Sequence, residues 1–339
     1  MEYELELQKN YLQGQAVETI YFGGGTPSLI GAPAIQRFID KIASLFSVKP
    51  DAEITLEANP DDLVGQEVKE LKQTAVNRFS IGIQSFFEED LRWMNRAHNA
   101  SEAEGSIKRV QDAGFENITI DLIYGYPLLN DEKWKSNIET ALKFEVPHIS
   151  AYSMTIEPRT ALAAFIRKGK QAAMDETQSA GQFITLIESL EKAGFEQYEI
   201  SNFAKPGHYS KHNTNYWKNV PYLGIGPSAH SFNGNSRQWN IRNNAKYTEG
   251  LQQHIVPFEI EELGMDDRFN EYIMTALRTM WGIDLNKIEQ DFGSGYRQDI
   301  ASDLKEFLDQ EQVVEENQAV KLTKSGKLFA DRIAAALFR

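Results

Sequence analysis

A run of three glycines follows a short stretch of β-branched and aromatic residues near the beginning of the sequence. The run is Gly23-Gly24-Gly25, Thr26 follows it, and residues 17–22 before it have the composition of a strand. A backbone without Cβ atoms can adopt positive φ and lets a ligand approach its N–H and C=O groups closely. The pattern predicts a backbone cradle for a small polar ligand, with a simple tight turn as the alternative.

Four polar side chains stand in or after further stretches that predict strands. Glu57 and Gln84 end two of these stretches, Asp121 lies inside an isoleucine-rich one, and Arg96 follows in a turn. Ligands bind where the strands of parallel sheets end, and a guanidinium suits a carboxylate. Each residue could instead form a surface ion pair or a loop cap, except that a buried acid such as Asp121 needs a partner. Together they predict a site for an amino-acid carboxylate, an ammonium group and a ribose diol.

Residues 198–247 are rich in glycine, asparagine and aromatic residues and contain His208, His212 and His230. The spacing of His208 and His212 would suit zinc on a helix, but the surrounding residues argue against a helix and no third ligand is evident. An imidazole among flat rings also suits haem, for which one axial histidine suffices. A structural aromatic cluster is the third alternative. Because periodic patterning is lost here, we expect a long ordered loop region, which in compact domains tends to be functional.

The composition favours a globular protein with a small-molecule partner. The 339 residues are 41% hydrophobic and carry a net charge of -14. This negative charge disfavours nonspecific electrostatic binding to nucleic acid or anionic lipid. No apolar run approaches the roughly 20 residues of a membrane span, and no signal-peptide pattern begins the sequence. We therefore expect a cytoplasmic protein. The absence of cysteine excludes disulfides and cysteine-ligated zinc or iron–sulfur clusters within this chain.

Alternating elements must position these residues. Strand-like stretches alternate with amphipathic helices up to a fifth visible strand at 148–152, which predicts an α/β fold with a parallel sheet, open or closed as a barrel. A helical reading continues from Ala161 to Gly194. Beyond Pro257, the order helix, hairpin, helix predicts a winged-helix-like module. Acidic residues outnumber basic ones between 261 and 339, so we expect this module to serve packing or protein contact rather than DNA binding.

The motifs in combination resemble the radical S-adenosylmethionine enzymes related to oxygen-independent coproporphyrinogen III oxidase. The resemblance runs essentially end to end. Its motifs are Gly23-Gly24-Gly25-Thr26-Pro27, Glu57-Ala58-Asn59-Pro60, Ser80-Ile81-Gly82-Ile83-Gln84-Ser85-Phe86 and Asp121-Leu122-Ile123-Tyr124-Gly125-Tyr126-Pro127. Within that group, His212-Asn213-Thr214-Asn215-Tyr216-Trp217 followed by Tyr222-Leu223-Gly224-Ile225-Gly226-Pro227 resembles the haem-chaperone branch, HemW, rather than the true oxidases, HemN.

The resemblance implies a domain plan and a set of ligand contacts. Residues 1–165 would form an incomplete (β/α)6-type partial TIM barrel without its first strand, 166–256 an extension with the histidine-rich loops, and 257–339 the winged-helix-like domain. S-adenosylmethionine would be bound through its ammonium by Gly24, Gly25 and Thr26, through its carboxylate by Arg96, and through its ribose and nearby polar atoms by Glu57, Gln84 and Asp121. Haem would be contacted by His212, with Tyr216 and Trp217 shaping its pocket.

The sequence departs from the family pattern in one respect. The three-cysteine signature that ligates a [4Fe–4S] cluster is absent, as is the first barrel strand that precedes it. We expect Met1 to be an internal methionine of a longer protein, with a natural cluster-free homologue as the alternative. In either case we expect this polypeptide not to cleave S-adenosylmethionine reductively, because it has no thiolates for the cluster.

The resemblance therefore predicts a haem chaperone that binds haem and S-adenosylmethionine and passes haem to an acceptor protein. One alternative is a coproporphyrinogen III oxidase, which makes protoporphyrinogen IX by oxidative decarboxylation of two propionates. The other is a catalytically silent binding or regulatory protein that uses only its C-terminal module.

Overall fold

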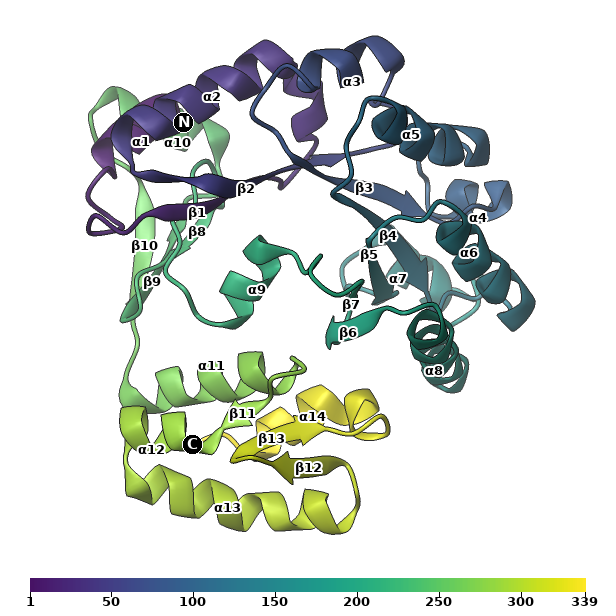
Figure 1. Cartoon of the computed structure of the whole chain (residues 1–339), viewed down its shortest axis with the longest axis vertical. Helices are drawn as coiled ribbons and strands as arrows, with labels where there is room; N and C mark the ends of the chain where they lie inside the picture. The colour runs from purple at the N-terminus through teal and green to yellow at the C-terminus, as the bar shows by residue number, and fades with distance from the viewer. The chain divides into compact units, whose positions relative to one another are not determined.

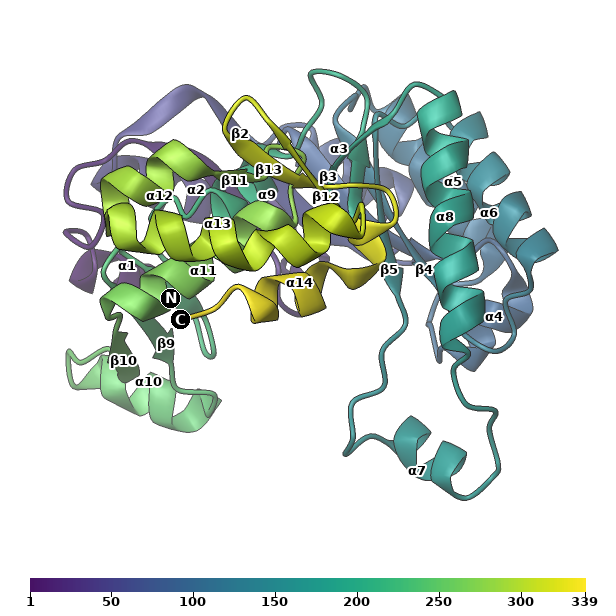
Figure 2. The ribbon, with the colours of Figure 1, turned by 90° about the horizontal axis from the view of Figure 1, so that it is seen from below.

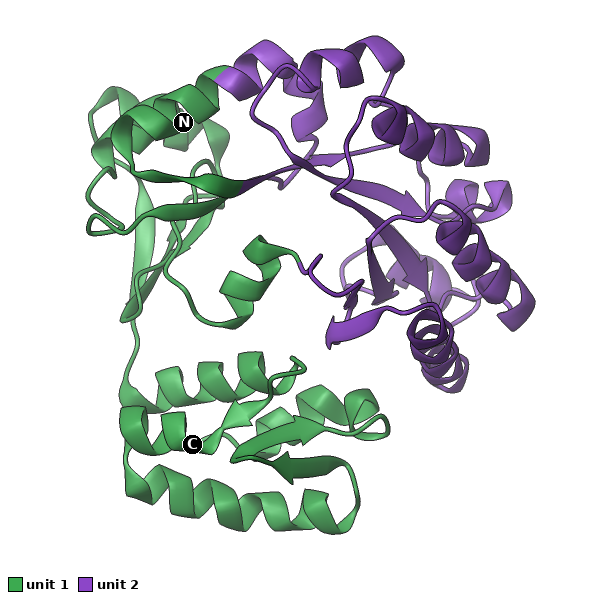
Figure 3. Cartoon of the chain, viewed as in Figure 1, with its two compact units in different colours: residues 1–19, 37–52, 210–339 green, residues 20–36, 53–209 purple.

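The chain divides into two compact units, each built from separated segments (Figure 3). The computed structural model describes residues 1–339. No helix is long and apolar enough to cross a membrane. Unit 1 comprises Met1–Thr19, Arg37–Ala52 and Ser210–Arg339, and unit 2 comprises Ile20–Gln36 and Glu53–Tyr209.

A seven-stranded sheet with the order β1-β2-β3-β4-β5-β7-β6 forms the frame of the α/β region. Strands β2 to β5 are parallel, β7 and β6 are antiparallel, and helices α3, α5, α6 and α8 cover one face of the unit 2 strands (Figure 1). The predicted fold class, an incomplete radical-SAM-type barrel, is confirmed. Its elements are β1 (Val17–Phe22), η1 (Pro27–Ile30), α2 (Ala32–Leu45), β2 (Val48–Ala58), α3 (Gly65–Leu71), β3 (Arg78–Gln84), α4 (Glu88–Trp93), α5 (Ala100–Asp112), β4 (Ile118–Tyr124), α6 (Asp131–Lys143), β5 (His148–Ser153), α7 (Ala161–Arg167), α8 (Glu176–Lys192), β6 (Glu196–Glu199) and β7 (Asn202–Ala204).

The parallel strands are apolar on one face and polar on the other. Successive side chains of a strand point to opposite faces, so residues two apart share a face. Leu56, Ile81 and Ile120 are fully buried on the apolar face. On the opposite face, register pairs Glu57 with Ser80 and Asp121 with Ser150. Strands of a fully covered parallel sheet are usually apolar on both faces, and the polar face of this sheet departs from that pattern where the candidate site residues Glu57 and Asp121 lie.

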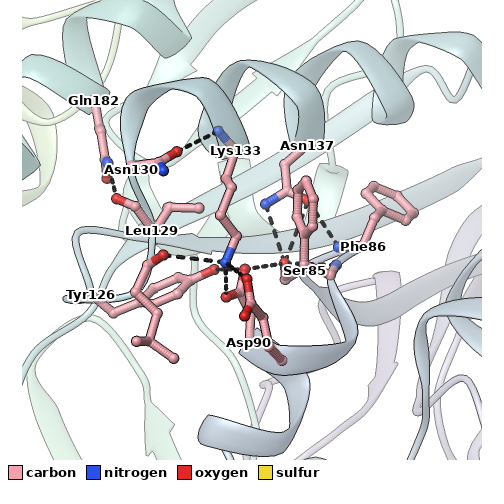
Figure 4. A network of polar contacts seen from close by, with 12 residues as sticks. Ser85, Phe86, Asp90, Tyr126, Leu129, Asn130, Lys133, Asn137 and Gln182 are labelled. Atoms are coloured by element: carbon pink, nitrogen blue, oxygen red, sulfur yellow. Dashed lines mark hydrogen bonds and ion pairs between the residues drawn. The ribbon is translucent and has the colours of Figure 1, made fainter.

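A buried polar network holds the segments directly after β3 and β4 (Figure 4). The Asp90 carboxylate is fully buried and accepts hydrogen bonds from Ser85 Oγ at 2.9 Å and Tyr126 OH at 2.7 Å. Lys133 Nζ on α6 forms an ion pair with Asp90 at 2.5 Å. Because a buried charge is costly unless it is paired and hydrogen-bonded, these contacts fix α4 against α6 at the end of the sheet where the strands terminate.

Helix α7 lies on a long excursion between β5 and α8, away from the strands of its own unit (Figure 2). None of its residues is buried. Trp93 Nε1 donates to Gln171 Oε1 at 3.0 Å and so ties the returning segment to α4. The helical expectation from Ala161 to Gly194 is confirmed for α7 and α8, but the segment that separates these two helices is not helical.

The loop region expected at 198–247 is only partly right, because short helices and strands interrupt it. A three-stranded antiparallel sheet with the order β10-β9-β8 begins there. Its central strand buries Ser236, Gln238 and Asn240 and leaves Arg237 and Trp239 partly exposed. Strands usually bury their apolar residues and expose their polar ones, so the alternation of hydrophobic residues could not reveal this strand. The elements of this part of unit 1 are α1 (Glu2–Leu7), α9 (Lys211–Trp217), β8 (His230–Phe232), β9 (Ser236–Asn240), α10 (Asn244–Gln252) and β10 (Phe258–Glu262).

Glu4 on α1 is the hydrogen-bond partner of Asn240, one of the buried polar residues of β9. Its carboxylate is fully buried and accepts hydrogen bonds from Gly226 N at 2.8 Å, Asn240 Nδ2 at 2.5 Å and the Tyr247 hydroxyl. Hydrogen bonds to a charged group are each stronger than neutral ones. One carboxylate thus joins the loop at Gly226, strand β9 and helix α10.

The C-terminal part of unit 1 has the element order of a winged helix, as predicted. Its three strands pair in the order β11-β13-β12, and Phe269 and Ile273 of its first helix are fully buried. The elements are α11 (Met265–Leu277), β11 (Ile283–Asp284), α12 (Leu285–Phe292), α13 (Ser294–Asp309), β12 (Val313–Glu316), β13 (Ala319–Leu322), η2 (Gly326–Phe329) and α14 (Ala330–Ala336).

Candidate functional site

Glu57, at the end of β2, binds the glycine loop that follows β1. Its carboxylate accepts hydrogen bonds from Tyr21 OH at 2.5 Å and from Gly24 N at 3.2 Å. A Cβ on Gly23 would lie 2.6 Å from the Tyr21 ring and 2.9 Å from the Glu57 carboxyl group, so only glycine fits there. The loop is therefore anchored to the neighbouring strand by an acidic side chain.

The next two glycines are exposed, and their backbone is open apart from Gly24 N, which donates to Glu57. Gly24 and Gly25 have φ of +73° and +130°, and a Cβ on either would meet no atom within 4 Å. Positive φ of this kind favours glycine. The Thr26 side chain caps nothing, although the residue precedes η1. The open backbone suits the cradle expected for a ligand ammonium, while the binding role of these three residues stays a prediction.

Asp121 is the acid that the sequence marked as needing a partner. It accepts a hydrogen bond from Ser80 Oγ at 3.3 Å. Burial, followed by the negative charge of Glu57, raises the pKa of the Asp121 carboxyl group from 3.8 to about 7, against the opposing effects of Arg78 and the neighbouring serines. Two acids that cannot easily ionise together favour a cationic ligand between or beside them.

Gln84, Arg96 and Asn59 gather over the backbone of Gly82. A Cβ at Gly82 would lie 2.8 Å from Gln84 Nε2 and 3.4 Å from Arg96 Nη2. Arg96 Nη2 donates to Asn59 Oδ1 at 2.7 Å, whereas Arg96 Nε is buried and has no hydrogen-bond partner. Gln84 itself has a positive φ of 66°. The Arg96 Nε–H group lacks a hydrogen-bond acceptor, and the Gln84 amide lies beside it over Gly82, which has no side chain. A ligand carboxylate could accept hydrogen bonds from both groups.

The two groups of residues lie on adjacent strand ends of unit 2. Glu57 and Asn59 are two residues apart on the same chain segment, and Glu57 is in register with Ser80, which bonds Asp121. The residues predicted for S-adenosylmethionine therefore converge at one edge of the sheet. This donor set fits a zwitterionic nucleoside with an additional positive charge. It does not fit a cysteine-ligated iron–sulfur cluster, since the chain has no cysteine.

The predicted haem residues lie on α9, which is anchored within unit 1. His212 Nδ1 lies 3.1 Å from Thr19 Oγ1, and Asn215 Nδ2 donates to Glu18 at 3.3 Å. Tyr216 is exposed, and its ring packs edge-on against Trp217 with centroids 5.5 Å apart. The roles of these residues toward haem stay predictions.

A pocket of about 840 Å³ lies beside α9 and includes Tyr216 among its lining residues, but neither His212 nor Trp217. Its volume is in the range typical of small-molecule sites. The sequence placed His230 in the histidine-rich region 198–247 without giving it a role, and the two arginines of the pocket, Arg237 and Arg242, were not among the predicted site residues. The other lining residues are Tyr222, Ser228, His230, Arg237, Trp239, Asn240, Arg242 and Glu261.

Comparison with known proteins assigns the family. Residues 1–141 match the Radical SAM superfamily, and residues 264–329 match the HemN C-terminal domain. The Heme chaperone HemW of Bacillus subtilis is 32% identical over 322 residues, which span 94% of this chain and 85% of that protein. The chain belongs to the HemW branch of the radical S-adenosylmethionine family. The Heme chaperone HemW of Lactococcus lactis is 33% identical over 92% of this chain and 82% of its own length.

The fold is also that of a solved member of the wider family. Coproporphyrinogen III oxidase (HemN) from Escherichia coli superposes with a TM-score of 0.83 and 21% identity, over 99% of this chain and 81% of that one. At this identity the likeness establishes the architecture alone. The predicted resemblance to radical S-adenosylmethionine proteins of the HemN and HemW type is thus confirmed.

Proposed function

We propose that this HemW-family chain binds haem and S-adenosylmethionine and passes haem to an acceptor protein. The observation that carries the proposal is the similarity, over 94% of the chain, to a protein named as a haem chaperone. An aromatic-lined pocket of about 840 Å³ in unit 1 supports it, because flat rings and imidazole are the groups that a porphyrin binds. His212, Tyr216 and Trp217 are the residues of α9 proposed to contact haem.

The proposed S-adenosylmethionine site is the edge of the sheet in unit 2. Backbone groups of Gly24, Gly25 and Thr26 would take the ammonium, and Arg96 the carboxylate. Glu57, Gln84 and Asp121 would take the ribose and nearby polar atoms. When bound, the ligand supplies a sulfonium cation, and the acids of the site supply the complementary negative charge.

The oxidase alternative has less support. Its evidence is a fold likeness at 21% identity, which does not extend to activity. We therefore propose the chaperone function alone.

Haem titration of the purified chain tests the proposal. We expect a saturable shift of the Soret band with one haem per chain. To measure transfer, the haem-loaded chain is mixed with increasing concentrations of an apo b-type cytochrome as the acceptor. Direct transfer gives a rate that rises with the concentration of the acceptor, whereas passive release gives a rate independent of it. Absence of saturable binding, or a concentration-independent rate, would refute the chaperone function.

Calorimetric titration with S-adenosylmethionine tests the second ligand. The Arg96→Gln variant should lose about tenfold or more in affinity, since hydrogen bonds to charged groups contribute about 1.5–3 kcal/mol. Arg92→Gln is the matched control, because Arg92 is an exposed arginine of α4 that pairs only with Glu88 on its own helix. Equal affinities of the two variants would contradict the site.

A further inference from the structure

The outer side of strand β10 is an unpaired edge of a sheet. Strand β10 comes first in the order β10-β9-β8 of the three-stranded sheet in unit 1, and all of its residues are exposed (Figure 1). An edge strand presents free backbone N–H and C=O groups that can pair with another extended chain. We call this surface, residues Phe258–Glu262, the β10 edge.

The register shows which backbone groups of the β10 edge are free. Ile241 N donates to Pro257 O at 3.0 Å, and Leu263 N donates to Asn235 O at 2.9 Å. Bonded and non-bonded residue pairs alternate along antiparallel strands, so the odd-numbered residues of this stretch bond toward β9. The N–H and C=O groups of the even-numbered residues of β10 therefore point outward, with the spacing that a partner strand requires.

The two faces of β10 differ in chemistry. Phe258 and Ile260 project from one face and are 44% and 53% exposed. Glu259 and Glu261 project from the other face, because successive side chains of a strand alternate. A strand paired with this edge would place every second side chain beside the apolar pair and the intervening ones beside the two carboxylates. The β10 edge is thus complementary to a segment in which apolar and basic residues alternate.

The two carboxylates are not neutralised within the sheet. Arg237 lies opposite Glu261 in the register, but its ion pair is with Glu271 at 2.8 Å. Glu259 accepts a hydrogen bond from the neutral indole of Trp239 at 3.1 Å. Negative charge that has no cationic partner in its own sheet favours a partner that carries positive charge.

The same charges argue against a second copy of this chain as the partner. If two β10 strands paired antiparallel, registers centred on residue 259, 260 or 261 would each place Glu259 or Glu261 opposite a glutamate of the other copy. Like charges directly opposite each other destabilise a strand pair. A segment with lysine or arginine at these positions would instead form opposite-charge pairs.

We propose that the β10 edge binds an extended segment of another protein, in which basic and apolar residues alternate, as an additional strand of the sheet. The outward backbone groups supply the hydrogen bonds, and Glu259 and Glu261 select the basic residues. This interaction does not depend on the proposed haem function, because it uses neither α9 nor the S-adenosylmethionine site.

The charge contact is tested by the fluorescence anisotropy of a labelled heptapeptide of alternating lysine and valine. We expect saturable binding of one peptide per chain, and no binding when glutamate replaces lysine in the peptide. Glu259→Gln combined with Glu261→Gln should weaken binding about tenfold. The matched control combines Glu315→Gln with Glu316→Gln on β12, which is also an edge strand, and should leave binding unchanged.

Backbone pairing is tested separately from charge. N-methylation of one alternate set of peptide nitrogens should abolish binding and methylation of the other set should not, because only alternate N–H groups of a strand face its neighbour. Ile260→Pro removes an outward N–H group without removing a hydrogen bond to β9, and should also abolish binding. Ile260→Ala keeps that N–H group and should bind the peptide more tightly than the proline variant.

Three results would overturn the proposal. Absence of saturable binding would show that the acidic residues only keep the edge unpaired. Equal losses in the β10 and β12 variants, or on methylation of either set of nitrogens, would show nonspecific attraction to an acidic protein. A concentration-dependent dimer of the chain that Ile260→Pro abolishes would assign the edge to a second copy.

Discussion

Replacing Asp121 with asparagine should stabilise the protein at alkaline pH and have little benefit at acidic pH. Asparagine keeps the size and shape of the side chain but cannot ionise. The pKa of Asp121 is raised from 3.8 to about 7, chiefly by burial and then by the charge of Glu57. Between these two pH values the folded chain therefore binds more protons at this residue than the unfolded chain.

The size of the effect follows from that difference. Stability falls with rising pH wherever the folded state binds the extra proton, so the loss begins near pH 4 and is complete above pH 7. A shift of roughly 3 pKa units corresponds to about 4 kcal/mol at 1.36 kcal/mol per unit. The Asp121→Asn variant lacks this penalty. About 1 kcal/mol of the penalty is already present at pH 4.5, so the stability of the variant relative to the wild type should increase by about 3 kcal/mol between pH 4.5 and pH 8.

Urea unfolding of both proteins at several pH values measures this difference. The Asp112→Asn variant serves as the control, because Asp112 is exposed near the end of α5 in the same unit and its replacement should change stability by at most about 0.5 kcal/mol at any pH. A difference between Asp121→Asn and the wild type that stays constant from pH 4.5 to pH 8 would refute the reasoning. It would mean that Asp121 is ionised without cost in the folded protein.

Two further substitutions test the framework of the site. Lys133→Met removes the ion-pair partner of the buried Asp90, which keeps its hydrogen bonds from Ser85 and Tyr126. The free energy of unfolding should therefore fall by about 3 kcal/mol, and the midpoint of urea unfolding should fall as well. No change in the midpoint would show that the pair contributes nothing. Gly23→Ala places a methyl group against Tyr21 and Glu57 and should displace the glycine loop, with a destabilisation of about 1–3 kcal/mol and weaker S-adenosylmethionine binding in calorimetry. Wild-type stability and affinity in this variant would contradict the close packing.

The sequence alone specified the α/β half of the protein because its signals are local. Helices such as α5 carry an apolar stripe at helical spacing, and the strands carry β-branched runs ended by glycine and polar residues. Because parallel strands end at the same edge of a sheet, the sequence also predicts that Glu57, Gln84 and Asp121 lie close together. The start of α5 is marked locally as well, by a capping box between Asn99 and Glu102.

The tertiary structure decided what depends on contacts between distant segments. Two of the buried polar residues of β9 have partners more than 200 residues earlier, because Asn240 donates to Glu4 and Gln238 donates to Gln8. No local pattern can reveal such a strand, since burial there follows hydrogen bonding rather than hydrophobicity. For the same reason, the pocket that joins His230 to Arg242 exists only once the three strands pair and α9 packs beside them. Sequence determined which residues could bind ligands, and long-range packing determined which of them share a site.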